Sequence, residues 1–305
     1  LGFSEGQYDA ILSYIFLKRL SERKIVVKKF FYPFENNLLE KPFILGCKDF
    51  FPKVEVVGYQ HTVWYENQFG MRLGHDEEKY HPIADKIIYT GPEYLNILQK
   101  SGFNGSKLIE GPNLRFKSVF QDVSTKVDIK RPNIFIPLTF DDDLAYYSLH
   151  LVQMLKEKYP QLTIYIRRHP LINYNKLNQF LKMIELKNYY FADDGTIQEW
   201  LLGMDIVLTT GGSVVIIEAA SIGAPTIRCR PGNNIFLDPL AWHDYPINPI
   251  NNFNSLEKEV NLILNGSSGE KDDYVRIGKD ILKKYITKPN NENFKIFEEL
   301  IGDEY

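Results

Sequence analysis

One short segment, 205–225, holds the residues best suited to bind a phosphate group. An apolar run there predicts a buried strand that ends in a turn before a helical pattern. Gly211 and Gly212 allow a ligand to approach the backbone. Ser213 is predicted to cap the helix, whose free N–H groups and dipole favour an anion. Glu218, on the first turns of this helix, is placed to accept from a ribose hydroxyl. A plain strand–turn–helix joint with a capping serine is the alternative, because glycine-rich turns are common.

A second candidate follows the predicted strand 162–166, where the sequence reads Arg167-Arg168-His169-Pro170. Arg168 and His169 beside a helix start suit a phosphate or a carboxylate. In a parallel sheet this segment ends at the same edge as the glycine turn, so both would border one crevice. A turn with solvated arginines is the alternative, but the pairing of the two motifs favours a binding site.

Two residues in the first half are candidates for a general base. Glu35 precedes the predicted helix 37–50, and His61 follows the predicted strand 54–57 together with Gln60. A carboxylate or an imidazole at a sheet edge can take a proton from a substrate. A helix-start charge and a hydrogen-bonded loop histidine are the structural alternatives.

Other polar clusters are interpreted structurally. Asp141 to Asp143 invite a metal, but they follow a strand and open a helix, where acidic residues cap and favour the dipole. No metal is therefore expected. The basic and aromatic stretch 28–32 allows contact with an acidic membrane surface, although a strand with a solvated entry is preferred. Trp242 and His243 are weaker candidates to reach a bound ligand.

Strand and helix patterns alternate along nearly the whole chain, which predicts an α/β fold with parallel sheets and helices on both faces. The predicted helices are 8–20, 37–50, 93–101, 143–158, 174–186, 214–222, 255–265, 274–286 and 292–301. The predicted strands, besides 28–32, are 54–57, 86–89, 107–110, 133–138, 162–166, 205–208 and 225–228.

The chain of 305 residues suggests two domains. A polar stretch without periodicity, 121–132, is predicted to link them, which gives domains 1–125 and 126–305 around a cleft. The last helix is expected to pack back on the first domain. The first residue is not Met, so we expect a piece of a larger multidomain protein, with the start of the first domain missing.

Composition sets further limits. The net charge of −3 gives no basis for nucleic-acid binding. Cys47 and Cys229 are far apart in the sequence, which fits a reducing compartment and no disulfide framework. No apolar run approaches the roughly 18 residues of a membrane span.

The order of strand, Arg-Arg-His-Pro, helix and glycine turn resembles the donor half of GT-B glycosyltransferases, above all those that build bacterial capsule and lipopolysaccharide. His169-Pro170 and Gly212-Ser213 stand where bacterial sialyltransferases and Kdo transferases have a His-Pro motif and a Ser-rich motif around the CMP phosphate. The resemblance implies two Rossmann-like halves facing a cleft, an acceptor-side domain 1–125 and a nucleotide-sugar domain 126–305. It also implies catalysis without a metal or a cofactor, since the nucleotide-sugar is a substrate.

By this resemblance the protein transfers a sugar to a surface-glycan or lipid-linked acceptor, with a CMP-linked keto-acid sugar such as Kdo or sialic acid as the favoured donor. Arg168, His169, Gly211, Gly212 and Ser213 would hold the donor phosphate, and Glu218 the ribose. Glu35 or His61 would deprotonate the acceptor, with His169 also acting in catalysis. The expected location is cytoplasmic, at the inner face of the membrane if the protein touches a membrane at all. The rivals are a nucleotide-sugar epimerase, a CDP-glycerol-type phosphotransferase and a non-catalytic glycan-binding domain of a larger synthase.

Overall fold

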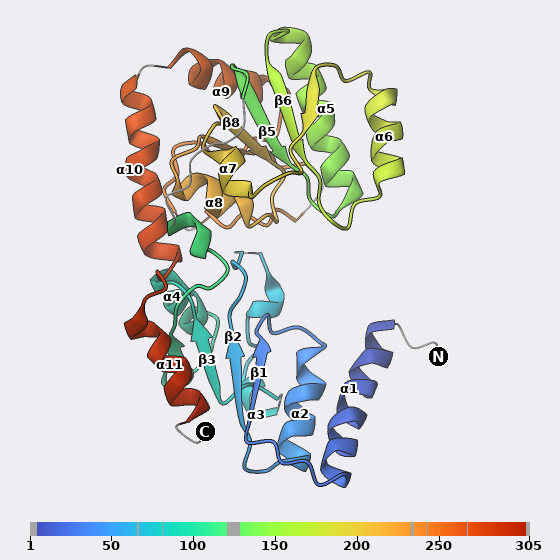
Figure 1. Cartoon of the computed structure of the whole chain (residues 1–305), viewed down its shortest axis with the longest axis vertical. Coiled ribbons are helices and arrows are strands. Elements are labelled where there is room, and N and C mark those ends of the chain that lie inside the picture. Colours follow the sequence, from blue (N-terminus) through green and yellow to red (C-terminus); the bar gives the residue numbers. More distant parts are fainter. Residues whose placement is uncertain are drawn as a thin grey trace. The chain divides into compact units, whose positions relative to one another are not determined.

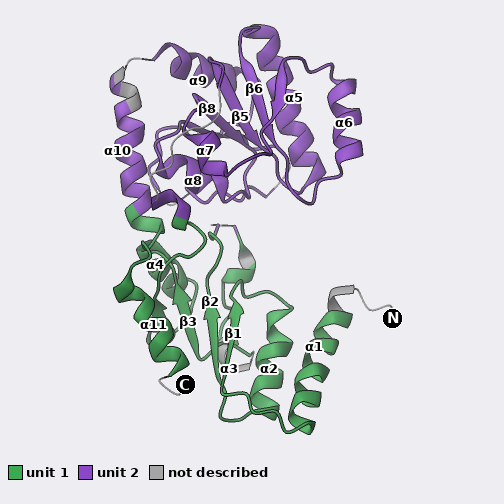
Figure 2. Ribbon diagram, in the orientation of Figure 1, with its two compact units in different colours: residues 1–64, 68–117, 283–305 green, residues 65–67, 118–282 purple. Residues whose placement is uncertain are grey.

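The structure, a computed structural model, describes residues 5–65, 67–80, 82–120, 129–232, 235–241, 243–266 and 268–302. The chain divides into two compact units, shown in Figure 2. Unit 1 holds residues 1–64, 68–117 and 283–305, and unit 2 holds residues 65–67 and 118–282. The expected domain boundary at 125/126 lies outside the described residues.

Unit 1 is built on a four-stranded parallel sheet in the order β1-β2-β3-β4 (Figure 1). Its strands are β1 (Lys29–Pro33), β2 (Glu55–Tyr59), β3 (Lys86–Tyr89) and β4 (Leu108–Glu110). Its helices are α1 (Glu5–Glu22), α2 (Glu40–Phe50), α3 (Glu77–Tyr80), α4 (Pro92–Lys100) and α11 (Asn291–Ile301). Short 3-10 turns lie at Phe69–Met71, Gly105–Lys107 and Lys117–Phe120.

The last helix of the chain belongs to unit 1. Leu300 of α11 is buried in a cluster with Val57 of β2 and Ile88 of β3, and Ile296 and Phe297 pack against the same cluster. These residues lie three and four apart, so they form one apolar face of the helix. α11 therefore covers one face of the unit 1 sheet.

Unit 2 is built on a five-stranded parallel sheet in the order β7-β6-β5-β8-β9. Its strands are β5 (Asn133–Pro137), β6 (Thr163–Arg167), β7 (Tyr189–Phe191), β8 (Ile206–Thr209) and β9 (Thr226–Arg228). Its helices are α5 (Asp142–Lys158), α6 (Tyr174–Met183), α7 (Ile197–Leu201), α8 (Val215–Ser221), α9 (Phe253–Asn265) and α10 (Ser268–Tyr285), whose last residues belong to unit 1.

The chain reverses its direction across the unit 2 sheet between β5 and β8. From β5 it adds β6 and β7 on one side, and it then returns to add β8 and β9 on the other. Beyond the carboxyl ends of such neighbouring strands lies the usual ligand crevice of an α/β sheet. β5 is buried throughout, as expected for a central parallel strand covered on both faces.

The core of unit 2 confirms the alternation predicted from the sequence. Phe135 of β5, Tyr165 of β6 and Val207 of β8 share one buried cluster with Trp200 of α7 and Ala219 of α8. The cluster shows that α7 and α8 cover one face of the sheet, as the apolar strands require.

Several elements differ from the prediction, among them the short helix α3, which was not predicted. Strand β7 was not predicted, because three residues, Tyr189 to Phe191, are too short for a recognisable pattern. Helix α6 ends at Met183, before Glu185, which has a positive φ of 50°. Helix α10 begins at Ser268, earlier than expected, in a polar stretch without apolar periodicity.

Helices α8 and α10 approach each other closely at Gly278 of α10. A Cβ atom there would lie 2.6 Å from the carbonyl oxygen of Ala220 and 2.9 Å from that of Ser221. No real side chain fits at such distances. The backbone of α10 therefore rests directly on the end of α8.

Candidate functional site

The glycine turn follows β8, at the point where the chain reverses direction across the sheet. Gly211 and Gly212 have φ values of 86° and 66°, a left-handed conformation that only glycine adopts readily. The N–H of Gly212 donates to the carbonyl of Leu237 at 2.7 Å. The turn is thereby fixed against the segment 235–241.

The two glycines have different surroundings. A Cβ on Gly211 would lie 2.8 Å from the ring of Phe236, whereas a Cβ on Gly212 would meet nothing within 4 Å. Gly211 is buried and Gly212 is exposed. The backbone at Gly212 therefore borders open space, as a phosphate-binding turn requires.

The predicted capping role of Ser213 needs a correction. The residue directly before α8 is Val214, which has helical angles and makes no side-chain cap. The Ser213 hydroxyl instead accepts from the N–H of Val215, the first residue of α8, at 3.3 Å. The hydroxyl still lies at the start of the helix.

The two arginines of the Arg-Arg-His-Pro segment bind the loop between β7 and α7. Arg167 donates to the carbonyls of Ala192, at 2.6 Å, and Gly195, at 3.2 Å. Arg168 forms an ion pair with Asp193. Both side chains thus hold two neighbouring loops together.

Aromatic rings complete the surroundings of Arg168. Its guanidinium lies 4.2 Å from the ring centre of Tyr174 and 4.4 Å from that of Phe191. With Asp193 as a third partner, its charge is already matched inside the protein. The donor-binding role expected of Arg168 remains a prediction. Its contacts in the structure tie the segment after β6 to α6, to β7 and to the loop after β7.

His169 has a defined protonation geometry. Its Nδ1 accepts from the N–H of Leu171 at 3.2 Å, so the neutral ring carries its proton on Nε2. Partial burial lowers the pKa of His169, which keeps the ring neutral near pH 7. Nε2 can therefore donate to an anion.

His169 and Ser213 lie at the same edge of the sheet. Their strands, β6 and β8, flank β5, so the strand axes are about 10 Å apart. The segment after β5 reaches both motifs: the ring of Phe140 lies 5.9 Å from that of His169, and Thr210 donates to the carbonyl of Leu144 at 3.3 Å. The two sequence motifs thus lie at the same edge of the sheet.

Glu218 points into the protein. Its side chain accepts from Gln198 of α7 at 3.3 Å, and the residue is only 7% exposed. A ribose hydroxyl would need an accessible carboxylate oxygen. The ribose role of Glu218 remains a prediction, and the visible contact joins α7 to α8.

Sequence reasoning missed a polar cavity of about 270 Å³ beyond the carboxyl end of β9. β8 and β9 are neighbours, and Phe236, which packs on Gly211, also lines the cavity. The cavity therefore lies beside the glycine turn. Its polar lining includes Asn67, Arg228, Arg230, Asp238, His243 and Asp244.

A buried ion pair forms the floor of this cavity. Arg228 and Asp238 are 2% and 4% exposed, and their charged groups lie 2.6 Å apart. Arg228 also donates to the carbonyl of Ile247 and lies over the ring of Tyr245. Because these partners already match the charge of Arg228, this side chain shapes the cavity and is not available as a cation for a ligand.

Arg230 is the candidate cation. It is exposed, and its guanidinium shows no ion pair or hydrogen bond to the part of the chain that the structure describes. The side chain can therefore turn to a ligand without losing a partner. An Arg-x-Arg spacing after a strand could have indicated this pair, because alternate residues of a strand share one face.

His243 forms another wall of the cavity. Its Nε2 lies 3.2 Å from a carboxylate oxygen of Asp280 in α10, and its side chain is almost fully buried. Trp242, which the sequence suggested together with His243, lies outside the described residues.

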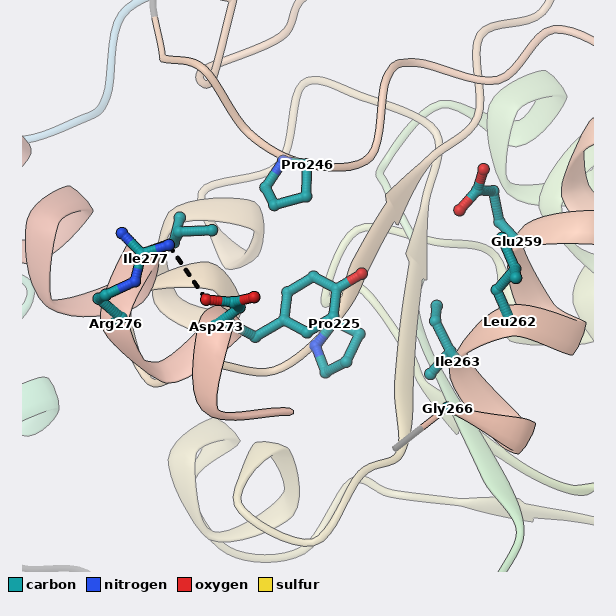
Figure 3. A pocket seen from close by; sticks show the side chains of 10 residues that line it. Pro225, Pro246, Glu259, Leu262, Ile263, Gly266, Asp273, Arg276 and Ile277 are labelled. Carbon is teal, nitrogen blue, oxygen red and sulfur yellow. Dashed lines mark hydrogen bonds and ion pairs between the residues drawn. The ribbon is translucent and has the colours of Figure 1, made fainter. Parts of the chain in front are cut away.

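A larger cavity, of about 350 Å³, lies elsewhere in unit 2 (Figure 3). Pro225, just before β9, lines it together with Leu262 and Ile263 of α9 and Ile277 of α10. The amino end of β9 is the edge opposite the glycine turn. This cavity therefore lies at the opposite edge of the sheet from the glycine turn.

In unit 1 the structure brings the two candidate bases together. Oε1 of Glu35 and Nε2 of His61 are 3.5 Å apart, and both side chains are about one third exposed. They follow adjacent parallel strands whose last residues, Pro33 and Tyr59, are register partners. The carboxyl edge of the unit 1 sheet thus carries a carboxylate–imidazole pair.

The pKa of His61 lies below its usual value. Burial is the largest cause, the charge of Arg115 adds to it, and Glu35 opposes both. Nδ1 of His61 is buried without a hydrogen-bond partner in the described residues. Nε2 and the Glu35 carboxylate are therefore the atoms of the pair that a substrate can reach.

The loop that carries Glu35 is held by Glu40. The carboxylate of Glu40 accepts from the N–H of Glu35 at 2.7 Å and from that of Asn36 at 3.0 Å. Asn36 has a positive φ of 53°, and its side chain accepts from Lys41 at 2.6 Å. These bonds fix the position of Glu35.

Gln60 fixes the neighbouring loop. It is fully buried, its side chain accepts from the N–H of Thr90 at 2.9 Å, and it donates to the carbonyl of Thr62 at 2.9 Å. The Gln60 side chain thus links the backbone of Thr62, the residue after His61, to the backbone of Thr90.

The described residues contain no group of three His, Cys, Asp or Glu side chains arranged to hold a metal. Asp141 caps α5 by accepting from the N–H of Leu144 at 3.0 Å, which confirms the structural interpretation of the aspartates. Within the same described ranges, no helix combines the length and the hydropathy that spanning a bilayer requires.

No family model and no curated protein sequence matches this chain. Solved structures do match. HepE from Anabaena in complex with UDP and glucose has 12% identity and a TM-score of 0.59, over 98% of this chain and 83% of its own. S. aureus MnaA with UDP has 11% identity and a TM-score of 0.65, over 98% and 82%.

UDP-GlcNAc 2-epimerase from Neisseria meningitidis, bound to UDP-GlcNAc, has 14% identity and a TM-score of 0.59, over 99% of this chain and 83% of its own. At such identities the likeness concerns the fold. Together with the two parallel sheets, it shows that this chain has the GT-B fold, with two Rossmann-like halves.

Proposed function

We propose that this protein is a glycosyltransferase whose donor is a UDP-linked sugar, bound at the carboxyl edge of the unit 2 sheet. The observation that carries the proposal is the polar cavity beside the exposed Gly212, with Arg230 as its free cation. A cation and an open backbone turn at the switch point of a parallel sheet suit a nucleoside diphosphate.

The nucleotide differs from the one that the sequence favoured. A CMP-linked keto-acid sugar has no support among the similar structures, in which the bound nucleotides are UDP and UDP-sugars. Two phosphates also match the two candidate donors: Nε2 of His169 for one, and Arg230 for the other.

The pair in unit 1 supplies the proton acceptor of the proposed reaction. The acceptor hydroxyl gives its proton to Glu35 or His61, and its oxygen bonds to the anomeric carbon of the sugar. The bond from that carbon to the phosphate oxygen breaks, and UDP leaves with the electron pair. His61 is suited to this step because its lowered pKa keeps it neutral near pH 7.

Calorimetric titration with UDP, CMP, CDP, ADP and uridine tests the donor site. We expect UDP to bind, and Arg230→Gln to weaken UDP binding about tenfold, the size of one charge-assisted hydrogen bond. Uridine, which has no phosphate, should bind both proteins equally. Lys187→Gln is the matched control, because Lys187 is an exposed cation at the opposite edge of the sheet. Absence of UDP binding, or equal losses in both variants, would reject the site.

A nucleotide-sugar epimerase is the second candidate, favoured by the match to the Neisseria epimerase over 99% of this chain. Incubation with UDP-GlcNAc and no acceptor separates the two activities. An epimer that accumulates without free UDP indicates an epimerase. Release of UDP only when a glycan acceptor is added indicates the transferase, with a surface glycan as the proposed acceptor class.

Two other activities remain as outcomes of the same titrations. Preference for CDP over UDP would favour transfer of a glycerol phosphate group. Glycan binding without any nucleotide binding would favour a non-catalytic domain of a larger synthase.

A further inference from the structure

Arg115 is an exposed cation of unit 1 that the protein leaves unmatched. Its guanidinium shows no ion pair or hydrogen bond to any residue that the structure describes. It belongs to the segment 111–116, which follows β4 and therefore lies at the same edge of the parallel sheet as Glu35 and His61. Most exposed arginines are simply solvated, so a role for this one depends on how it is held.

The segment that carries Arg115 is fixed to the end of β2. The hydroxyl of Tyr59 donates to the carbonyl of Pro112 at 2.9 Å and accepts from the N–H of Leu114 at 2.9 Å. Tyr59 is the last residue of β2 and stands two positions before His61. One side chain therefore holds the backbone just before Arg115 against the strand that leads to His61.

A chain of buried polar side chains joins the same two segments. Gln60, the neighbour of His61, accepts from the N–H of Thr90 at 2.9 Å. The hydroxyl of Thr90 accepts from the side chain of Asn113 at 3.0 Å. Gln60, Thr90 and Asn113 are 0%, 0% and 4% exposed. Buried hydrogen-bonded networks of this kind rigidify the segments that they join, so Arg115 has a defined place beside His61.

Arg115 lies close enough to His61 for its charge to act on the imidazole. Burial is the largest cause of the lowered pKa of His61, Glu35 opposes it, and the charge of Arg115 lowers the pKa further. This edge of the sheet therefore combines a carboxylate, an imidazole and a guanidinium. A sugar whose hydroxyl meets the Glu35–His61 pair would bring its neighbouring groups close to Arg115.

We propose that Arg115 binds an anionic group of the sugar acceptor, either the carboxylate of an acidic sugar or a sugar-linked phosphate. This inference rests on the glycosyl transfer proposed above, in which the acceptor hydroxyl meets Glu35 and His61. A guanidinium presents parallel N–H groups that match two oxygens of a carboxylate or a phosphate. Such a contact fixes the orientation of the acceptor toward the base. The acceptor class is then an acidic glycan.

NMR titration of the protein, followed at the His61 ring, tests this contact without any transfer reaction. The probes are glucose, glucuronate and glucose 6-phosphate at equal ionic strength. We expect glucuronate or glucose 6-phosphate to bind about tenfold more tightly than glucose, the size of one charge-assisted hydrogen bond, and the tighter of the two identifies the anionic group. Arg115→Gln should remove this preference. Arg115→Lys should keep part of it, because the charge remains while the parallel N–H groups are lost.

Arg23→Gln is the matched control, since Arg23 is an exposed arginine between α1 and the amino end of β1. It should leave the preference for acidic sugars intact. Without any sugar, Arg115→Gln should raise the pKa of His61, whereas Arg23→Gln should not. The proposal is overturned if no preference exists, if it survives Arg115→Gln, or if that variant leaves the pKa of His61 unchanged.

Calorimetry with UDP separates this proposal from the proposed function. Arg115→Gln should bind UDP as tightly as the original protein, because the UDP site is assigned to unit 2. A loss of UDP affinity in this variant would assign Arg115 to the donor and overturn the proposal. Absence of UDP binding in the original protein would reject the transferase instead, and the His61 titration would still decide whether Arg115 binds an anionic sugar.

Discussion

Nε2 of His61 lies 3.5 Å from Oε1 of Glu35, each residue placed two positions beyond the end of its strand. The sequence offered the two as alternative bases. Because β1 and β2 are parallel and in register at Pro33 and Tyr59, the alternatives form one pair. The charge of Glu35 therefore acts to raise the pKa of His61, against the larger effect of burial.

Glu35→Gln should lower the pKa of His61 further. Burial and Arg115 already lower it, and the charge of Glu35 is the opposing influence that the variant removes. NMR titration of the imidazole measures this shift. Glu22→Gln, a carboxylate lost from the end of α1, should have no effect. A His61 pKa that stays the same or rises in Glu35→Gln would contradict the pairing.

His61 also contributes to the pH dependence of stability. Its folded pKa lies below the unfolded value near 6.5, so its contribution is complete above that pH. The contribution declines as the pH falls through the lowered pKa, because the unfolded chain binds the proton more readily. His61→Asn should make the unfolding free energy less dependent on pH in that acidic range. Denaturant titrations at several pH values measure it, and an unchanged slope would contradict the assignment.

Removing either member of the pair should slow the proposed transfer. Glu35→Gln and His61→Ala should each lower kcat by about 10²- to 10⁴-fold, the usual contribution of a general base. The affinity for UDP should not change, since that site is assigned to unit 2. Rate measurements with saturating donor, beside calorimetry with UDP, test both halves of the statement. A variant that loses UDP affinity but keeps the same kcat would contradict this prediction.

Glu40 should titrate near neutrality. Burial raises its pKa to about 7, although its hydrogen bonds to the N–H groups of Glu35 and Asn36 act in the other direction. The folded state holds the proton more tightly than the unfolded chain. Its contribution to stability is therefore complete below about pH 4.5 and is lost as the pH rises through about 7. Glu40→Gln should abolish this component, which denaturant titrations across pH 4 to 8 can show.

The two turn glycines should respond differently to alanine. Gly211→Ala combines a left-handed φ with a clash at 2.8 Å from Phe236, and it should destabilise unit 2 by more than about 2 kcal/mol. Gly212→Ala meets open space and should cost only about 1 kcal/mol. Its methyl group would occupy the proposed phosphate position, so UDP affinity should fall. Thermal unfolding and calorimetry separate the effects, and equal behaviour of the variants would contradict the assigned surroundings.

Breaking the Arg228–Asp238 pair should destabilise the protein strongly. Both groups are almost completely buried, so Asp238→Asn leaves an unmatched charge and should cost about 3–5 kcal/mol. Asp142→Asn, which affects an ion pair 3.7 Å long at the start of α5, is the exposed control and should cost less than about 1 kcal/mol. Chemical denaturation measures both values. A mild effect of Asp238→Asn would mean that water reaches Arg228.

The sequence predicted what depends on local pattern. Apolar strands and helical spacing located the main elements, and the rule that parallel strands end at one edge put His169 and Ser213 on the same side of the sheet. The partner of Arg168 could not be predicted, because Asp193 is 25 residues away and reaches it only through the pairing of β6 with β7.

The cavity beside β9 could not be predicted from the sequence for a similar reason. Much of its wall comes from the segments 236–241 and 243–249, which have no periodic pattern, and the buried contact between Arg228 and Asp238 helps to shape it. Charged side chains are usually solvated, whether in a strand, as Arg228 is, or in a loop, as Asp238 is, so burial of both is not expected from the sequence. Only the three-dimensional arrangement shows that Arg228 is matched by Asp238, whereas Arg230 has no such partner among the described residues.

The backbone contact at Gly278 limits which residue this position can hold. Side chains normally separate the backbones of two packed helices. At Gly278, the carbonyl oxygens of Ala220 and Ser221 lie directly against the backbone of α10. Any side chain larger than that of glycine at position 278 would therefore push α8 and α10 apart. Since α8 begins three residues after Gly212, a substitution at Gly278 would also disturb the helix that follows the glycine turn.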